Sequence, residues 1–230
     1  MLAVFVNALT VILGSTLGVL LNKHLKEEYT KTVIACMGIC TMVIGITGAI
    51  ATSNIIIVVI CLVVGTVIGE LLKLGQRLDN VGNWLKSKLP QNGNSQFTEG
   101  FVSASLLFCI GSMSIMGSFE AGLQGNYDIT FAKAAMDGII SVTFAATMGI
   151  GVAFSALTII AYQGGLTLLA GVIAPILSAP VITEMSAVGG VMLIATGMNI
   201  MKLTKDRIRV GNMLPALIFP VIWFAVAGLY

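Results

Sequence analysis

Long apolar runs separated by short polar segments make up almost the whole chain. Six runs contain no charged residue: 1–22, 32–69, 100–119, 138–183, 185–201 and 210–230. About 20 helical residues cross a hydrocarbon core of ~30 Å. The two longest runs therefore predict two membrane spans each, and the other four predict one each. The pattern indicates an all-α, polytopic membrane protein with eight transmembrane helices.

Turn-forming residues indicate where the two long runs divide. In the first run, "ATSN" (51–54) separates a span at Val33–Ala51 from a span at Ile55–Leu72. In the second run, "AYQGG" (161–165) combines a glutamine with a Gly-Gly pair, which is typical of a turn rather than of a helix centre. We therefore expect span 5 to end and span 6 to begin at residues 161–165.

The one long polar segment, 73–98, predicts a helix on the inner leaflet followed by a linker. Basic residues alternate around a stripe of apolar side chains at spacings of three and four, Leu74, Leu78, Val81, Leu85 and Leu89, which is typical of a helix lying on a membrane surface. "PQNGNSQ" (90–96) reads as a flexible linker. A regulatory or partner-docking element is the alternative, and the segment is too short for a soluble catalytic domain.

The composition agrees with a membrane protein, and the basic residues orient it. Residues are 57% hydrophobic and 10% charged, with a mean hydropathy of +1.01. All but one of the 12 Lys and Arg residues lie between spans 1 and 2, after span 3, or between spans 7 and 8. These loops share one side, which the positive-inside rule makes cytoplasmic, so both termini are predicted outside. The net charge of +2 marks this face and does not indicate nucleic acid binding.

A faint internal similarity predicts an inverted repeat. "ALTVILG" (8–14) in span 1 resembles "GLTLLAG" (165–171) in span 6, and Gly38 and Gly45 have the same separation as Gly190 and Gly197. Spans 1–3 and 6–8 would then be inverted copies, as in alternating-access transporters. The residues 1–230 would form a single transmembrane domain with a first three-span repeat (1–72), a cytoplasmic helix and linker (73–98), two central spans (99–161) and a second three-span repeat (162–230).

The stretch "FCIGSMSIMGSF" (108–119) in span 4 is unusual for a simple anchor. Its glycines ease unwinding and its hydroxyl groups offer ligands, at Gly111, Ser112, Met113, Ser114 and Gly117. Broken backbone inside a membrane is tolerated where it lines a cavity, whereas small residues also allow close helix packing. We expect a departure from regular helix between Gly111 and Gly117, with "TMGIGVAFSA" (147–156) as the facing wall. Four polar side chains could reach the same space: Asn7, Gln163, Asn199 and Asn212.

Ionisable residues near the spans suggest the kind of solute. Asp137 and Glu184 lie toward the outer ends of spans 5 and 7 and are candidate pathway residues, whereas Glu70 and Glu99 read as interfacial. Solvation at the interface, with Lys133 and Asp137 as an i,i+4 pair, is the alternative. Since no basic residue is predicted at the midplane, a cation, a proton-coupled solute or a neutral solute is favoured over an anion.

The sequence predicts neither an enzyme nor a cofactor. The single histidine, His24, lies in a basic loop, and no zinc, phosphate-loop or dinucleotide-binding motif is present. The cysteines Cys36, Cys40, Cys61 and Cys109 fall inside predicted spans and read as small apolar residues. A soft-metal pathway on the face shared by Cys109, Met113 and Met116 is the weaker interpretation, so no metal site is predicted.

Several segments resemble the YqgA/YdfK-like family of bacterial integral membrane proteins. The similarity extends over nearly the whole chain and is carried by "VNALTVILGSTLG" (6–18), "GELL" (69–72), "FCIGSMSIMGSFEAGL" (108–123), "AKAAMDGIISVTFAATMGIGVAFSA" (132–156), "YQGGLTLLAG" (162–171) and "RVGNMLPAL" (209–217). The family is a domain of unknown function. The resemblance therefore implies a multi-pass protein of the bacterial inner membrane and assigns no role to any residue.

The sequence thus predicts a membrane transport protein that moves a small solute or ion along broken helices. The alternative is a non-transporting scaffold or regulator whose glycine-rich spans pack, for instance as a homodimer. In either case membrane lipid is the surrounding partner.

Overall fold

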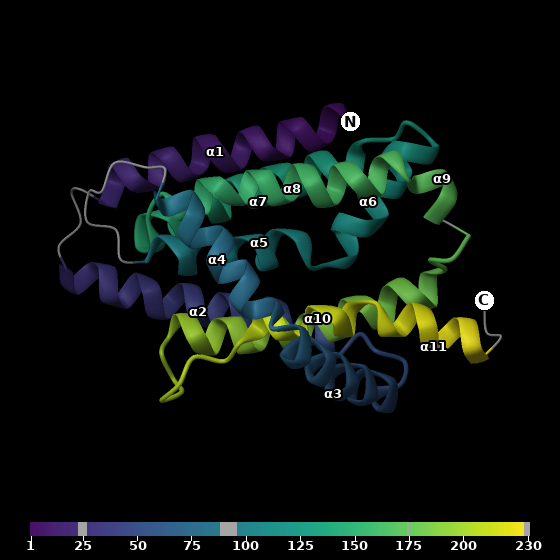
Figure 1. The fold of residues 1–230 in the computed structure, drawn as a ribbon. Coiled ribbons are helices and arrows are strands. Elements are labelled where there is room, and N and C mark those ends of the chain that lie inside the picture. The colour runs from purple at the N-terminus through teal and green to yellow at the C-terminus, as the bar shows by residue number, and fades with distance from the viewer. Residues whose placement is uncertain (23–26, 88–95, 174, 228–230) are drawn as a thin grey trace. The chain divides into compact units, whose positions relative to one another are not determined.

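The computed structural model describes residues 1–22, 27–87, 96–173 and 175–227, and every regular element in these ranges is a helix (Figure 1). Six helices are long and apolar enough to cross a membrane: α1 (Leu2–Asn22), α2 (Glu27–Ala49), α3 (Ile55–Leu72), α7 (Asp128–Met148), α8 (Gly151–Leu168) and α10 (Ala179–Ile200). α5 (Phe97–Cys109) and α6 (Ser112–Leu123) form a bent pair that would make a seventh span. The all-helical membrane class is therefore confirmed, and the count of eight spans stays a prediction.

The eighth predicted span corresponds to two short elements. η1 (Val210–Leu217) is a 3₁₀ helix that contains Pro215, and α11 (Phe219–Ala227) follows it. The predicted surface helix is present as α4 (Leu74–Ser87), where Trp84 is 59% exposed. The linker predicted at 90–96, apart from Gln96, and His24 lie outside the described residues. The remaining element is the short α9 (Ala170–Ile173).

The chain forms two compact units. The first contains Met1–Met37, Asp79–Cys109 and Met113–Ala170, and the second contains Gly38–Leu78, Ile110–Ser112 and Gly171–Tyr230. Each unit combines segments from both predicted three-span repeats. The segments 1–72, 99–161 and 162–230 therefore describe the order along the chain and not separate compact bodies.

In the first unit, α1 packs closely along α7 and runs in the same direction. Thr10 Oγ1 donates to the Ala134 carbonyl at 2.9 Å, and a side chain on Gly14 or Gly18 would collide with the backbone of α7 at Gly138 or Val142. The small residues of α1 thus bring two helix backbones into contact, as is typical of membrane helix pairs.

α8 returns in the opposite direction beside α1 and α7. Asn7 near the start of α1 contacts Gln163 near the end of α8. α5 runs parallel to α8, because the rings of Phe97 and Phe154 lie 5.3 Å apart and the hydroxyls of Ser105 and Thr158 are 2.9 Å apart. The first unit is therefore a bundle in which α1 and α7 run one way and α5 and α8 the other.

The division predicted at residues 161–165 is wrong. These residues lie inside α8, and the long run divides at Gly149 and Ile150 instead. Gly149 ends α7 with φ of 78°, which residues with a side chain rarely adopt. Gln163 does not need a turn because it finds hydrogen-bond partners inside the unit.

In the second unit, α2 and α10 pack antiparallel through glycines. A Cβ on Gly45 would lie 2.6 Å from the Gly190 carbonyl oxygen, and a Cβ on Gly197 would lie 2.6 Å from the Gly38 carbonyl oxygen. α3 packs against η1 in a similar way, since a side chain on Gly65 would collide with Ala216 and one on Gly69 with Asn212. Close backbone contact therefore requires glycine at these positions.

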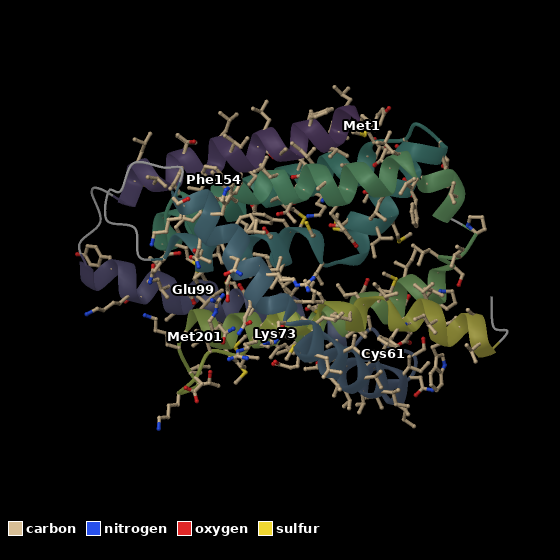
Figure 2. The ribbon with its side chains drawn as sticks, viewed as in Figure 1. Met1, Cys61, Lys73, Glu99, Phe154 and Met201 are labelled. Carbon is tan, nitrogen blue, oxygen red and sulfur yellow. The ribbon has the colours of Figure 1, made fainter. Side chains whose placement is uncertain are left out.

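Large apolar side chains cover the outer surfaces of the spans. Along α1 they project away from the bundle (Figure 2), and the exposed ones are Leu2, Phe5, Leu9, Ile12, Leu13, Leu17, Leu20 and Leu21. α2 and α3 carry similar exposed sets. Apolar surface of this extent is typical of helices surrounded by lipid.

Candidate functional site

The stretch singled out in the sequence contains a sharp break. α5 ends at Cys109, α6 begins at Ser112, and the two helices are bent by 60°. Gly111 has φ of 156°, and nothing lies within 4 Å of the position that its Cβ would occupy. Gly111 is therefore required by backbone conformation and not by close packing.

The departure from helix is shorter than predicted. It is confined to Ile110 and Gly111, and α6 continues as regular helix through Gly117. A Cβ on Gly117 would lie 2.8 Å from Thr130 Oγ1, so this glycine allows close packing of α6 against α7. The two interpretations of the glycines thus apply to different residues, the break to Gly111 and packing to Gly117.

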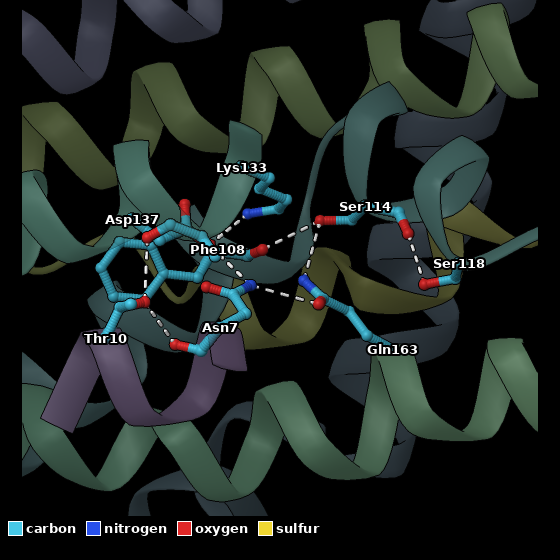
Figure 3. Close-up of polar contacts among 9 residues, drawn as sticks. Asn7, Thr10, Phe108, Ser114, Ser118, Lys133, Asp137 and Gln163 are labelled. Atoms are coloured by element: carbon cyan, nitrogen blue, oxygen red, sulfur yellow. Dashed lines mark hydrogen bonds and ion pairs between the residues drawn. The ribbon is translucent and has the colours of Figure 1, made fainter. Parts of the chain in front are cut away.

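Serine hydroxyl groups bridge the break. Ser114 Oγ donates to the Phe108 carbonyl at 2.9 Å, and Ser118 Oγ donates to the Ser114 carbonyl at 2.7 Å (Figure 3). Carbonyl groups at the end of a helix have no partner within it. Ser114 supplies one to the last turn of α5 and so connects the two half-helices.

A continuous chain of buried polar side chains leads from this break to an ion pair. Gln163 Nε2 donates to Ser114 Oγ at 3.4 Å, and Gln163 Oε1 accepts from Asn7 Nδ2 at 3.2 Å. Asn7 Nδ2 also donates to Asp137 Oδ2 at 3.1 Å, and Lys133 Nζ lies 2.5 Å from the same oxygen (Figure 3). Four helices contribute, namely α1, α6, α7 and α8. We call these five residues the polar chain.

Every member of the polar chain is buried. Asn7 is 0% exposed, Gln163 1%, Ser114 2%, Asp137 5% and Lys133 8%. Opposite charges in a protein interior compensate each other, whereas one charge without its partner is strongly destabilising. The charges of the polar chain therefore sum to zero, and its burial in the protein requires both Lys133 and Asp137.

Two buried polar atoms beside the polar chain have no partner among the described residues. They are Asn7 Oδ1 and Thr130 Oγ1, which lies one helical turn before Lys133. Buried acceptors are nearly always satisfied in native proteins. The Asn7 amide oxygen would therefore accept a hydrogen bond from a water, a solute or a neighbouring group that becomes protonated.

The interpretation of Lys133 and Asp137 as a solvated interfacial pair is wrong, although their i,i+4 pairing is confirmed. The charge-free run starts at residue 138, so the sequence alone puts both residues near the end of span 5. The helix α7 instead begins at Asp128 and carries both side chains into the bundle. Asp137 lies near the middle of α7 rather than toward its end. Lys133 is the sixth of the 21 residues of α7, and the expectation that no basic residue lies at the midplane stays a prediction.

Three other predicted residues lie in the second unit and have local partners. Glu184 accepts hydrogen bonds from Thr52 Oγ1 at 2.5 Å and from the Ser53 amide at 2.8 Å, which holds the loop between α2 and α3. Asn199 binds the backbone of Ile208 at 2.8 and 2.9 Å. Asn212 Oδ1 accepts from the Gly75 amide at 2.5 Å. These side chains hold loops and helix ends, and their place in a pathway stays a prediction.

The remaining candidates flank the break. Ser112 is the first residue of α6, and Met113 is 37% exposed. Cys109 lies on α5 whereas Met113 and Met116 lie on α6, so the continuous face proposed for soft-metal ligands is interrupted by the bend. None of the four cysteines forms a disulfide. The prediction of small buried residues holds for Cys61 and Cys109 and is wrong for Cys36 and Cys40, which are exposed.

A separate apolar pocket lies in the second unit between α3 and α11. It is lined by Ile60, Cys61, Phe219, Ile222, Trp223 and Val226. This lining offers no polar group comparable with the polar chain.

Apolar helices, glycine-mediated contacts and a buried ion pair define an integral membrane protein of the all-helical class. The chain belongs to the family described as "Protein of unknown function (DUF554)", which it matches over residues 2–225. This confirms the resemblance found in the sequence.

Two relatives are similar over nearly their whole length. The uncharacterized membrane protein YdfK of Bacillus subtilis (strain 168) is 32% identical over 218 residues, which cover 93% of this chain and 91% of YdfK. The uncharacterized protein YqgA of Escherichia coli (strain K12) is 29% identical over 232 residues, which cover 96% of this chain and 98% of YqgA. No solved structure gives a significant match.

Proposed function

We propose that this protein is a non-enzymatic membrane transport protein, which moves a small solute or ion past the polar chain in the first unit. The observation that carries this proposal is the unbroken series of hydrogen bonds from Lys133 to Ser114, which ends where α5 and α6 are bent. Substrate sites of transporters typically lie where spanning helices are discontinuous.

Structural packing alone does not require such a chain. Apolar residues of similar volume often replace a buried ion pair without loss of stability, and ionisable groups inside membrane spans usually mark a pathway. Here the ion pair, two amides, a hydroxyl and the unsatisfied Asn7 oxygen occupy one continuous region. Their concentration at a helix break favours transport over a scaffold.

The glycine contacts also favour transport over a homodimeric scaffold. The glycines of α2 and α10 that would form a dimer face contact each other within the chain. The small residues of α1 are likewise covered by α7. These surfaces are already filled and are not available to a second copy.

We further propose an eight-span path in the bacterial inner membrane, with both termini outside the cytoplasm. Counting α5–α6 and η1–α11 as one span each, the path predicts that α1 and α7 run parallel and that α2 and α10 run antiparallel, as the contacts within each unit have them. The glycine pairs Gly38–Gly197 and Gly45–Gly190 exchange with each other under a two-fold rotation, which supports the inverted repeat.

The transport proposal is tested by reconstituting the purified full chain in liposomes. Uptake of labelled sodium, rubidium, chloride, pyruvate and glycerol would be compared with protein-free vesicles. We expect at least one solute to enter faster, and Gly111→Leu to reduce that rate at least tenfold because leucine disfavours φ of 156°.

Gly165→Leu is the matched control, since Gly165 is helical and nothing lies within 4 Å of its Cβ position. This variant should keep more than half of the rate. Failure of the wild-type protein to move any of these solutes, or equal rates for the two variants, would contradict the proposal and favour the scaffold.

A further inference from the structure

We infer that the polar chain binds one proton together with one monovalent anion, so that the protein couples anion movement to proton movement. The proton binds to the carboxylate of Asp137, and the anion takes the place of that carboxylate beside Lys133. This inference rests on the proposed transport function and specifies its substrate class.

The first step follows from the hydrogen bonds of Asn7. Its Nδ2 donates both to Asp137 Oδ2 and to Gln163 Oε1, whereas its Oδ1 is buried without a partner. A protonated carboxyl group is a hydrogen-bond donor. Rotation of the Asn7 amide would let Oδ1 accept from protonated Asp137. The same rotation would release Nδ2 from Asp137 and Gln163, so that it could donate to an incoming anion.

The second step follows from charge. Among the described residues, Asp137 is the only carboxylate that contacts the Lys133 ammonium. Protonation of Asp137 removes its negative charge. A buried ammonium without a counter-charge is strongly unfavourable. The site therefore returns to neutrality when a solute brings one negative charge to Lys133.

In the part of the chain that the structure describes, the other ionisable groups of this bundle make no ion pair with the Lys133 ammonium. α1 has no ionisable side chain, and the Cys109 thiol of α5 is buried near the pair. Glu120 of α6 accepts from Asn126 in the following turn. The other ionisable groups on the helices of this bundle are Glu99, Asp128 and Tyr162.

The surroundings of Lys133 suit a small anion. Asn7 Nδ2 now donates to Asp137 and Gln163, and it would become a donor to the anion once Asp137 is protonated. The 12-residue α6 begins at the break. The amino end of a helix carries partial positive charge and favours anions. The proposed exchange is balanced: the Lys133–Asp137 pair, one proton and one anion give a Lys133–anion pair and a neutral Asp137 carboxyl.

The experiment uses the full chain in liposomes that contain a pH-sensitive dye. An inward gradient of chloride, nitrate or pyruvate, against gluconate at equal pH, should acidify the interior for at least one anion. Because one proton accompanies one anion, the rate should stay within twofold when the membrane potential is clamped at different values. If the rate of acidification in the wild-type protein changes more than twofold with the membrane potential, the inference is overturned.

Asp137→Asn separates proton coupling from anion binding. Asparagine resembles the protonated carboxyl group, so we expect anion-driven acidification to fall at least tenfold while exchange of the labelled anion across the membrane persists. Lys133→Gln should lose both activities. Asp128→Asn, the same change at an exposed position of α7, should keep both within twofold.

The outcomes distinguish this inference from the proposed function. Uptake of sodium, rubidium or glycerol without proton movement overturns the inference and leaves the transport function standing. Acidification that persists in Asp137→Asn also overturns it. Absence of any flux through wild-type protein contradicts both.

Discussion

At the scale of single residues, the neutral ion pair is the feature on which the candidate site depends. Lys133 and Asp137 are one helical turn apart on α7, and both are almost fully buried. Their spacing in the sequence predicted the pair, but its burial depends on α1 and α8, which lie far away along the chain.

Removal of both charges should therefore cost less than the sum of the two single removals. We expect Lys133→Met and Asp137→Asn each to lower the free energy of unfolding by about 3 to 5 kcal/mol, since each leaves one buried charge unpaired. The double variant should lose less than the sum, with a coupling of at least ~1 kcal/mol. Denaturation of the protein in detergent micelles measures these values.

Lys205→Met is the control for this cycle, because Lys205 is exposed and its replacement should change the free energy of unfolding by less than ~0.5 kcal/mol. Strictly additive losses for Lys133 and Asp137 would mean that the two side chains do not interact.

Gly111 should respond to substitution through its backbone. Gly111→Ala meets open space but forces a residue with a Cβ to adopt φ of 156°, which should cost about 1 to 3 kcal/mol. Gly165→Ala also meets open space, within helix α8, and should gain up to about 1 kcal/mol. Thermal unfolding in detergent compares the two. A neutral effect of Gly111→Ala would show that residue 111 has a negative φ.

At the scale of elements, helix pairing is governed by small residues rather than by polarity. α1 contacts α7 through Gly14 and Gly18, and α2 contacts α10 through its own glycines. The equal spacing of the glycines in α2 and α10 was visible in the sequence. Their mutual contact was not, because spacing within each helix says nothing about the partner of either.

The contact between α2 and α10 predicts a reciprocal effect. A Cβ on Gly45 would lie 2.6 Å from the Gly190 carbonyl oxygen, so Gly45→Ala should force the helices apart and cost about 1 to 3 kcal/mol. Gly190→Ala should cost a similar amount. The double variant should cost less than the sum, because one movement of α2 away from α10 makes room for both methyl groups. Gly171→Ala, which meets open space, is the control in the same unfolding assay.

At the scale of the whole molecule, membrane topology can be measured independently of function. In a background without the four native cysteines, Gln124→Cys should react with an impermeant thiol reagent added to intact cells. Lys205→Cys should react only after the membrane is opened, because the basic loops are predicted to face the cytoplasm. Both positions are exposed. Reaction of both from the same side would contradict the eight-span path.

The sequence by itself determined that this protein lies in a membrane, that it is helical, and to which family it belongs. These depend on long apolar runs, which require a membrane and require helices that satisfy their own backbone groups. The sequence also indicated the break at Gly111, because glycine and serine in an apolar span weaken the helix in which they lie. Asn7, Gln163, Asp137 and Ser114 could be named as candidates because polar side chains are costly in hydrocarbon.

Only the tertiary structure decided which of the polar residues meet. It placed Asn7, Asp137, Gln163 and Ser114 in one chain and gave Glu184, Asn199 and Asn212 separate partners in the second unit. It also moved the helix boundary to Gly149 and brought Lys133 into the site. A charge-free run identifies residues that can face lipid without a polar partner. A buried charge is tolerated when a compensating charge lies beside it. Which groups lie beside each other is decided by the folding of the chain.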